Sequence, residues 1–212
     1  MGNLCNIFST EMWQFDNDDM DQFHPNIRTS SVNNEDLKQM ILEKEKTEAS
    51  DTFSNNGGWH SSGALQNDKR FSALRDFIAL GIKQVISHNN YLDVDIGISN
   101  AWANVNRYRD FNEIHQHPGV HWSGVYYVDV PENSGAIRFF DPRVVRQMTM
   151  PYELYSENLE SIPYSQCLQI TLDPHTGSML IFPSWLQDAV HPNETKEPRI
   201  SISFNIILIP HN

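Results

Sequence analysis

The sequence predicts a mostly β protein in which two helices precede a sheet-rich body. From Ile96 onward, short runs rich in Val, Ile, Tyr and Phe alternate with Pro, Gly, Asn and Asp, at intervals typical of a β-sandwich or β-barrel. Before that point, two stretches carry apolar residues at helical spacing. No internal repeat or low-complexity linker divides the 212 residues. We therefore expect one domain over 1–212, with a helical part at about 34–92 and a β core at about 96–209.

The N-terminal part is predicted to supply one strand and two helices. Residues 4–15 alternate loosely between apolar and polar side chains, which suits a strand. Leu37, Met40 and Ile41 recur at helical spacing after a cap-like start and predict a short helix. Residues 52–62 are rich in glycine and asparagine and predict a loop. A second helix is indicated by a longer apolar stripe, formed by Phe71, Leu74, Ile78, Ile82, Val85 and Ile86.

Strands are predicted in the C-terminal part at residues 98–108, 123–130, 136–140, 166–171, 178–183 and 199–209. The last of them has one polar face, with Arg199, Ser201, Ser203 and Asn205, and one apolar face. A strand at the surface is one explanation, and a strand that lines a cavity is the other. Serine and asparagine are poor strand formers, and an arginine fork matches a carboxylate, so this polar face suits a cavity.

Charge, cysteine content and hydropathy argue against a nucleic-acid partner, a cysteine-based framework and a membrane segment. The chain has 15 Lys and Arg against 27 Asp and Glu, a formal net charge of −12, which argues against a nucleic-acid partner. Cys5 and Cys167 stand too far apart in sequence to indicate a disulfide framework or a thiolate zinc site. No apolar run approaches the roughly 20 residues that span a bilayer, and no basic and apolar leader is visible. We expect a soluble, cytoplasmic protein with no membrane partner.

The run His115-Gln116-His117 is the strongest indication of chemistry. Two histidines two residues apart project from one face of an extended strand and can offer two nitrogens to a metal ion. Imidazole suits iron, zinc, copper or nickel, and a carboxylate as third ligand with open positions favours non-haem iron(II). Asp188 is a candidate for that carboxylate. The competing interpretation is that these are ordinary core or surface side chains.

Taken in order, several segments resemble the 2-oxoglutarate and iron(II)-dependent oxygenases, specifically a family of small members from bacteria and their phages. The resemblance covers most of the chain and implies a double-stranded β-helix, or jelly roll, with N-terminal helices packed outside the larger sheet. The segments that carry it are 7–13, 54–61 with Gly57-Gly58-Trp59, 102–106, 115–119 with His115-Gln116-His117-Pro118-Gly119, 123–127, 139–143, 182–186 and 199–205.

The resemblance also implies an iron(II) site, with two departures from the usual pattern. The wider superfamily has a histidine, an acid two residues later and a distal histidine. Here His117 stands at the usual position of the acid, and Asp188 stands where the smaller family usually has the distal histidine. Two imidazoles and one carboxylate therefore remain in exchanged order, and we expect His115, His117 and Asp188 to bind iron(II). The alternatives are His191 as third ligand, a two-histidine site completed by water, and His121, which the Pro118-Gly119 turn is expected to direct elsewhere.

For the cosubstrate, the resemblance assigns Arg199 to the distal carboxylate of 2-oxoglutarate, with Ser201 beside it. Tyr127 is a second candidate for that carboxylate, or an ordinary core tyrosine. Asn106 and Asn205 are candidates to line the same cavity, although buried asparagines often only satisfy backbone groups.

The activity implied is hydroxylation, with 2-oxoglutarate and dioxygen as cosubstrates and a small-molecule or peptidyl substrate that the sequence does not identify. A loop surface with Trp59, His60 and Trp122 is a candidate to receive it. Double-stranded β-helix proteins often pair, so a homodimer is considered. The candidates for orienting the imidazoles are Glu113, Asp141 and Gln187.

Two other interpretations of the chain are weighed. One is a catalytically inactive jelly-roll binding or structural protein that has lost an iron ligand. The other is a cupin-like enzyme that uses zinc or nickel, for which Arg199 and Ser201 would have no evident task.

Overall fold

The computed structural model describes residues 3, 7–19, 32–91, 93–143 and 167–211, and it contains two antiparallel sheets. The larger sheet has the order β1 (Trp13–Asp16), β9 (Ser178–Pro183), β6 (Trp122–Asp129), β11 (Arg199–Pro210), β4 (Val94–Asn106) and β3 (Trp59–His60). The smaller sheet has the order β2 (Asn55–Asn56), β5 (Phe111–His115), β10 (Asp188–Val190), β7 (Ile137–Phe140) and β8 (Gln169–Leu172). The predicted mostly β jelly-roll class is therefore confirmed.

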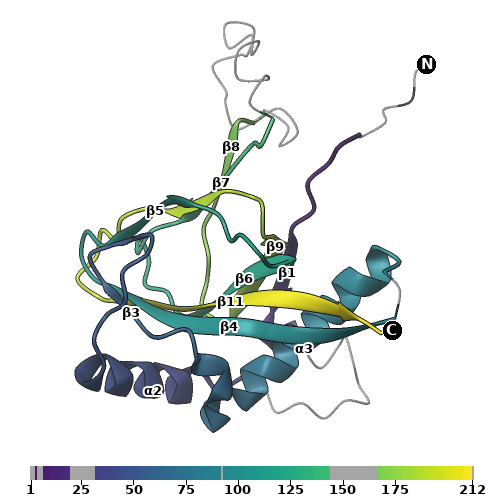
Figure 1. The fold of residues 1–212 in the computed structure, drawn as a ribbon. Coiled ribbons are helices and arrows are strands. Elements are labelled where there is room, and N and C mark those ends of the chain that lie inside the picture. The colour runs from purple at the N-terminus through teal and green to yellow at the C-terminus, as the bar shows by residue number, and fades with distance from the viewer. Residues whose placement is uncertain (1–2, 4–6, 20–31, 92, 144–166, 212) are drawn as a thin grey trace, which may run out of the picture.

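Two helices lie along the side of the larger sheet that faces away from the smaller one (Figure 1). Helix α2 (Asn34–Thr47) begins after Asn33, whose side chain accepts hydrogen bonds from the first free backbone amides. Helix α3 (Ser72–His88) carries the predicted apolar stripe. Among the described residues there are also three short 3₁₀ helices, η1 (Asn17–Asp19), η2 (Leu65–Asn67) and η3 (Lys69–Phe71). No helix among the described residues is long and apolar enough to span a membrane.

The larger sheet has a helix face and a cavity face, and β11 shows the division. Ile200, Ile202, Phe204 and Ile206 join the helices in the main apolar core, where each is essentially inaccessible to solvent. Burying a side chain of this size stabilises the fold by about 1.5–3 kcal/mol. The alternate residues of β11 point into the space between the sheets, where a smaller apolar cluster also lies. The stability of the fold thus rests mainly on the helix face.

All of the strands predicted in the C-terminal part are present; the strand predicted at 178–183 has those bounds, and the others have shifted ends. β4 begins earlier than predicted and ends at Asn106 because the chain turns there: the Arg107 amide donates to Asp110 Oδ2 at 2.7 Å, and Arg109 adopts a left-handed φ of 73°. The strand predicted at 4–15 is wrong in extent, since only Trp13–Asp16 pairs with β9; residues 4–6 lie outside the described residues, as does residue 166 of the predicted 166–171 strand.

The predicted loop at 52–62 is wrong, because it contains two short strands that belong to different sheets. Asn55–Asn56 pairs with β5, and Trp59–His60 pairs with β4. Gly57 and Gly58 connect them with φ values of 73° and 68°, a conformation that glycine adopts at little cost. The chain therefore crosses from the smaller to the larger sheet at this turn.

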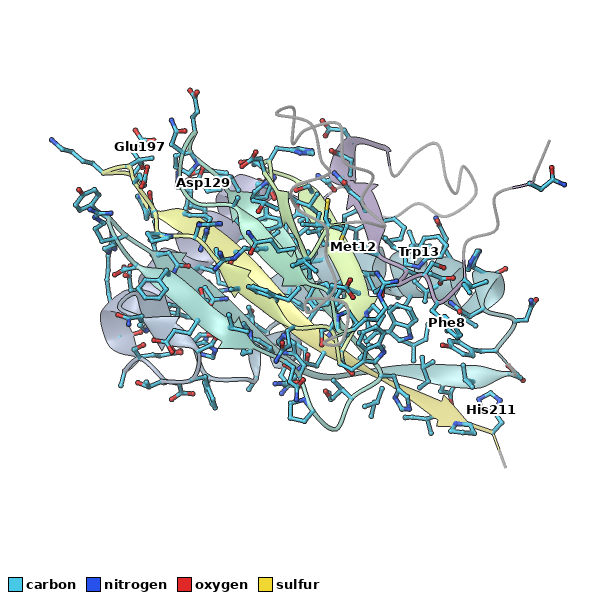
Figure 2. All side chains as sticks on the ribbon, turned by 90° about the horizontal axis from the view of Figure 1, so that it is seen from above. Phe8, Met12, Trp13, Asp129, Glu197 and His211 are labelled. Carbon is cyan, nitrogen blue, oxygen red and sulfur yellow. The ribbon has the colours of Figure 1, made fainter. Side chains whose placement is uncertain are left out.

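β11 runs the length of the larger sheet. Seen from above, Asp129 and Glu197 lie near one end of the sheet, and His211 lies at the opposite end (Figure 2). At the first end, Lys38 of α2 forms an ion pair with Asp129 at 2.6 Å. Arg199, at the start of β11, is therefore placed toward this end of the cavity face.

The packing of α3 on β9 predicts the effect of one substitution. A Cβ atom at Gly81 would lie 2.9 Å from Ile181 Cδ1 and 3.1 Å from Met179 Cε. We expect Gly81→Val to destabilise the protein by about 1–3 kcal/mol through overpacking, measured by urea unfolding. The exposed Lys83 on the same helix gives the control, because Lys83→Val should cost no more than about 0.7 kcal/mol. Equal unfolding free energies for the two variants would contradict this packing.

Candidate metal centre and cosubstrate pocket

A cavity of about 520 Å³ lies between the cavity face of the larger sheet and the smaller sheet. Its walls combine polar side chains from β4 and β11 with the candidate ligands, which lie on β5, on β10 and just beyond the end of β5. Of the predicted site residues, it is lined by His115, His117, Tyr127, Asp188, Arg199, Ser201 and Asn205. The structure thus brings together residues that are up to 90 positions apart in the sequence.

The three candidate iron ligands form one group. Asp188 stands directly opposite His115 across the β10–β5 pair, in the central strand of the smaller sheet. His115 Nε2 lies 3.8 Å from Asp188 Oδ2, and His117 Nε2 lies 3.5 Å from Asp188 Oδ1. Their ligand atoms all fall within 4.8 Å of one another, and among the described residues this is the one such group of His, Cys, Asp and Glu.

Different contacts orient the two imidazoles. β5 ends at His115, whose Nδ1 lies 2.9 Å from the carbonyl oxygen of Glu113; a carbonyl only accepts, so Nδ1 carries the hydrogen and Nε2 is left as a ligand atom. His117 lies beyond the strand, where its backbone amide donates to Ser184 O at 3.0 Å. The ring of His117 packs near Trp102 and Phe182, with centroid distances of 6.0 and 6.2 Å. The expectation of one strand carrying both histidines is therefore wrong, although the rings still meet.

The group fits a divalent metal ion. Asp188 is 4% exposed, and its Oδ1 is buried without a hydrogen-bond partner among the described residues. Burying a carboxylate without a partner is costly, and a cation between this oxygen and the two Nε2 atoms would remove that cost. Two imidazoles and one carboxylate, with open positions left, are also the donor set that suits non-haem iron(II). His115, His117 and Asp188 could therefore bind iron.

The alternative histidines lie elsewhere. His191 follows β10, and its backbone amide donates to Ala136 O at 2.9 Å, but the residue does not line the cavity. His121 lies beyond the Pro118-Gly119 turn, where Gly119 has a φ of 84°. The Nδ1 atom of His121 accepts a hydrogen bond from the Leu208 amide. Neither His191 nor His121 joins the group of candidate ligands.

Arg199 is a buried cation that the described part of the chain does not neutralise. Its Nη1 donates to the carbonyl oxygens of Ser134 and Gly135 at 3.2 and 2.9 Å, and its Nη2 donates to Asn106 Oδ1 at 3.0 Å. None of these acceptors carries charge, and Nε has no partner among the described residues. Burial lowers the pKa of Arg199 to about 10, so the guanidinium remains charged at neutral pH. The side chain is 2% exposed and lines the cavity, so it could bind an anion there.

The neighbours of Arg199 include both predicted and unpredicted residues. Tyr127 and Ser201 face each other across the β6–β11 pair and line the cavity. Burial raises the pKa of Tyr127, so its phenol stays neutral and can donate a hydrogen bond. Asn106 does not line the cavity but holds Arg199. Gly135 was missed: its φ is 101°, and a Cβ there would lie 2.9 Å from Arg199 Nη1, so the absence of a side chain lets the carbonyls approach.

The expectations for the supporting residues are partly wrong. Glu113 supports His115 through its backbone carbonyl, not through its carboxylate. The carboxylate of Asp141 binds Arg143, and neither Asp141 nor the exposed Gln187 lines the cavity.

Two of the residues expected to receive substrate belong to the apolar core. Trp59 and Trp122 are buried in the core on the helix side of the larger sheet, whereas His60 lines the cavity. The side of the sheet on which a side chain falls depends on pairing, which the sequence alone did not reveal.

The chain matches a known protein family. The sequence pattern of a family described as "Putative 2OG-Fe(II) oxygenase" matches residues 100–205, half of the chain, which includes every candidate ligand and cosubstrate residue. A search of curated protein sequences finds no match.

Solved structures similar to this chain have the same fold at low sequence identity. A prolyl-4-hydroxylase from Pseudomonas putida is 12% identical, with a TM-score of 0.59, 96% of this chain covered and 95% of that one. A prolyl hydroxylase from Trichoplax adhaerens, in complex with a hypoxia inducible factor peptide fragment, is 14% identical, with a TM-score of 0.57 and coverages of 92% and 83%. HygX from Streptomyces hygroscopicus, with nickel and 2-oxoglutarate bound, is 9% identical, with a TM-score of 0.57 and coverages of 93% and 82%. The chain belongs to the family of 2-oxoglutarate and iron(II)-dependent oxygenases.

Proposed function

We propose that this protein is a dioxygenase that hydroxylates an organic substrate, with iron(II) bound by His115, His117 and Asp188 and 2-oxoglutarate bound by Arg199. One observation carries the proposal: a single cavity contains a buried carboxylate with a partnerless oxygen and a buried guanidinium that no described acid neutralises. A metal ion would neutralise the first and a dicarboxylate the second. The single domain expected over 1–212 is part of the same proposal.

The proposed reaction is balanced without a further reductant. Iron and 2-oxoglutarate, when bound, supply the oxidising chemistry: dioxygen gives one oxygen atom to succinate, formed with carbon dioxide from 2-oxoglutarate, and the other to a substrate C–H bond, which becomes C–OH. The two electrons that dioxygen needs beyond those from the C–H bond come from the keto acid.

In this proposal, the residues of the chain bind and orient the reactants. The Nδ1–H of His115 donates to the Glu113 carbonyl and so keeps Nε2 available as a ligand atom. Arg199 binds one end of 2-oxoglutarate through a charge-assisted pair, and the hydroxyls of Ser201 and Tyr127 donate to the same carboxylate; their pairing on β11 and β6 and their place in the cavity lining support this role. Asn106 and the Gly135 carbonyl hold the guanidinium in place before the anion arrives.

The ligand assignment is tested by anaerobic titration of the metal-free protein with iron(II) and 2-oxoglutarate. We expect the parent to develop a weak visible metal-to-ligand charge-transfer band and to form succinate when dioxygen is admitted with a substrate. Asp188→Ala should abolish the band because it removes the buried carboxylate, while His191→Ala should retain it. Loss of the band in His191→Ala but not in Asp188→Ala would show that His191, not Asp188, is the third ligand. A folded parent without a band would favour the inactive binding protein or another metal.

The cosubstrate assignment is tested with Arg199→Gln. Removing one partner of a buried charge pair costs about 2–5 kcal/mol, so the dissociation constant of 2-oxoglutarate should rise by at least about 30-fold. Iron(II) affinity, measured separately by calorimetry under anaerobic conditions, should stay within a fewfold of the parent. Arg199→Lys keeps the charge and should recover part of the affinity. Unchanged 2-oxoglutarate affinity in Arg199→Gln would show that the keto acid binds elsewhere.

A further inference from the structure

The cavity continues past the candidate iron ligands, on the side away from Arg199. His117 packs near Trp102, which stands opposite Ser203 on β11, and near Phe182. Ser203 is four residues from Arg199, about 13 Å along an extended strand. Cosubstrate bound between the ligands and Arg199 therefore leaves the part of the cavity around Asn205 and its partner on β4 for another molecule.

A hydrogen-bond donor is fixed in this outer part of the cavity. Asn100 Oδ1 accepts from Asn205 Nδ2 at 3.0 Å and from Ser99 Oγ at 3.1 Å. Asn205 is itself held by the fully buried Ser123, whose hydroxyl donates to Asn205 Oδ1 at 2.7 Å. With its oxygen used in this way, Asn100 is left with an amide nitrogen that has no partner among the described residues, and the residue lines the cavity. Such a nitrogen donates to a carbonyl or another acceptor.

The charge of the lining argues against an acidic substrate. Arg199 is the one Lys or Arg among the described lining residues, and the cosubstrate would neutralise it. Burial lowers the pKa of His60, so its imidazole is neutral at physiological pH and offers no charge to an anion. Once Asp188 binds iron, the remaining charged side chain is the exposed carboxylate of Glu113, which repels anions and attracts cations.

Two large apolar side chains stand at the rim of the cavity. Phe53 and Ile114 both line the cavity, although their exposed fractions are 74% and 54%. They are neighbours, because the Glu113 amide donates to Ser54 O at 2.8 Å and aligns the two chain segments. Large apolar side chains exposed at the mouth of a cavity are typical of a surface that an apolar part of a ligand covers.

We infer that the primary substrate is an amide-bearing molecule without net negative charge, whose carbonyl oxygen accepts a hydrogen bond from Asn100 Nδ2 and whose apolar part covers Phe53 and Ile114. This inference rests on the function proposed above, since it places the substrate beyond the iron. A peptide and a free amino-acid carboxamide share this chemistry, and the test separates them.

The test measures binding to zinc(II)-loaded protein with 2-oxoglutarate, in which no turnover occurs. The peptide probes are acetylated, amidated tripeptides Ala-X-Ala with X as Leu, Lys or Asp, and the small probes are leucinamide and lysinamide. Titrations followed by saturation-transfer NMR should show that a Leu or Lys probe binds at least about tenfold more tightly than the Asp probe. Binding confined to the tripeptides would identify the substrate as a peptide. Equal binding of the tripeptides and the carboxamides would identify it as a small molecule.

Two variants assign the donor. Asn100→Leu should weaken binding of the Leu probe about five- to tenfold, which is the effect of losing one neutral hydrogen bond. Asn100→Asp keeps the size and the acceptor oxygen of the side chain but removes the donor. It should therefore weaken binding of the Leu probe to a similar extent. The exposed Asn67, which does not line the cavity, gives the control Asn67→Leu, with unchanged binding.

Three results would overturn the inference: equal binding of the Asp probe, full binding in Asn100→Leu, or no binding of any probe at millimolar concentration. The iron and 2-oxoglutarate charge-transfer band is recorded on separate iron(II)-loaded samples of the parent and the variants. A retained band with any of these results would overturn the substrate assignment and leave the proposed function standing, whereas loss of the band in the parent would remove both.

Discussion

The burial of two opposite charges in one cavity is the constraint on which the rest of the site depends. Asp188 and Arg199 are 4% and 2% exposed, and each has a polar atom without a partner among the described residues. A protein does not keep a charge in such surroundings without compensation, because the desolvation cost of an unpaired ion is several kcal/mol. Here the two charges do not form an ion pair with each other, so each side chain is available to a ligand of opposite charge.

The two faces of the larger sheet have separate roles, and the apolar packing on one face offsets the free-energy cost of burying charges on the other. Ile200, Ile202 and Phe204 pack toward the helices and stabilise the domain, while Arg199 and Ser201 alternate with them and face the cavity. The period of two along residues 199–209 predicted this division, and the structure confirms it. Short strands such as β10 were not predicted, because three residues carry no periodicity and their pairing depends on partners distant in sequence.

The same distinction explains how much of the site could be predicted. Residue types and spacing were enough to single out His115, His117 and Asp188, but not to choose between Asp188 and His191, which depends on the register of β10 against β5. The contacts that orient the ligands could not be predicted from the sequence, for a different reason. His115 is oriented by the backbone carbonyl of Glu113. Every residue has such a carbonyl, so the residue type at position 113 does not reveal the contact.

Anomalous diffraction from crystals grown anaerobically with iron(II) would show whether a metal ion binds among His115, His117 and Asp188. A single strong peak at the iron absorption edge, within bonding distance of the two Nε2 atoms and an Asp188 oxygen, is the predicted result. A peak at other side chains, such as His191, or no peak in crystals with well-ordered sheets would show that these three residues do not bind iron.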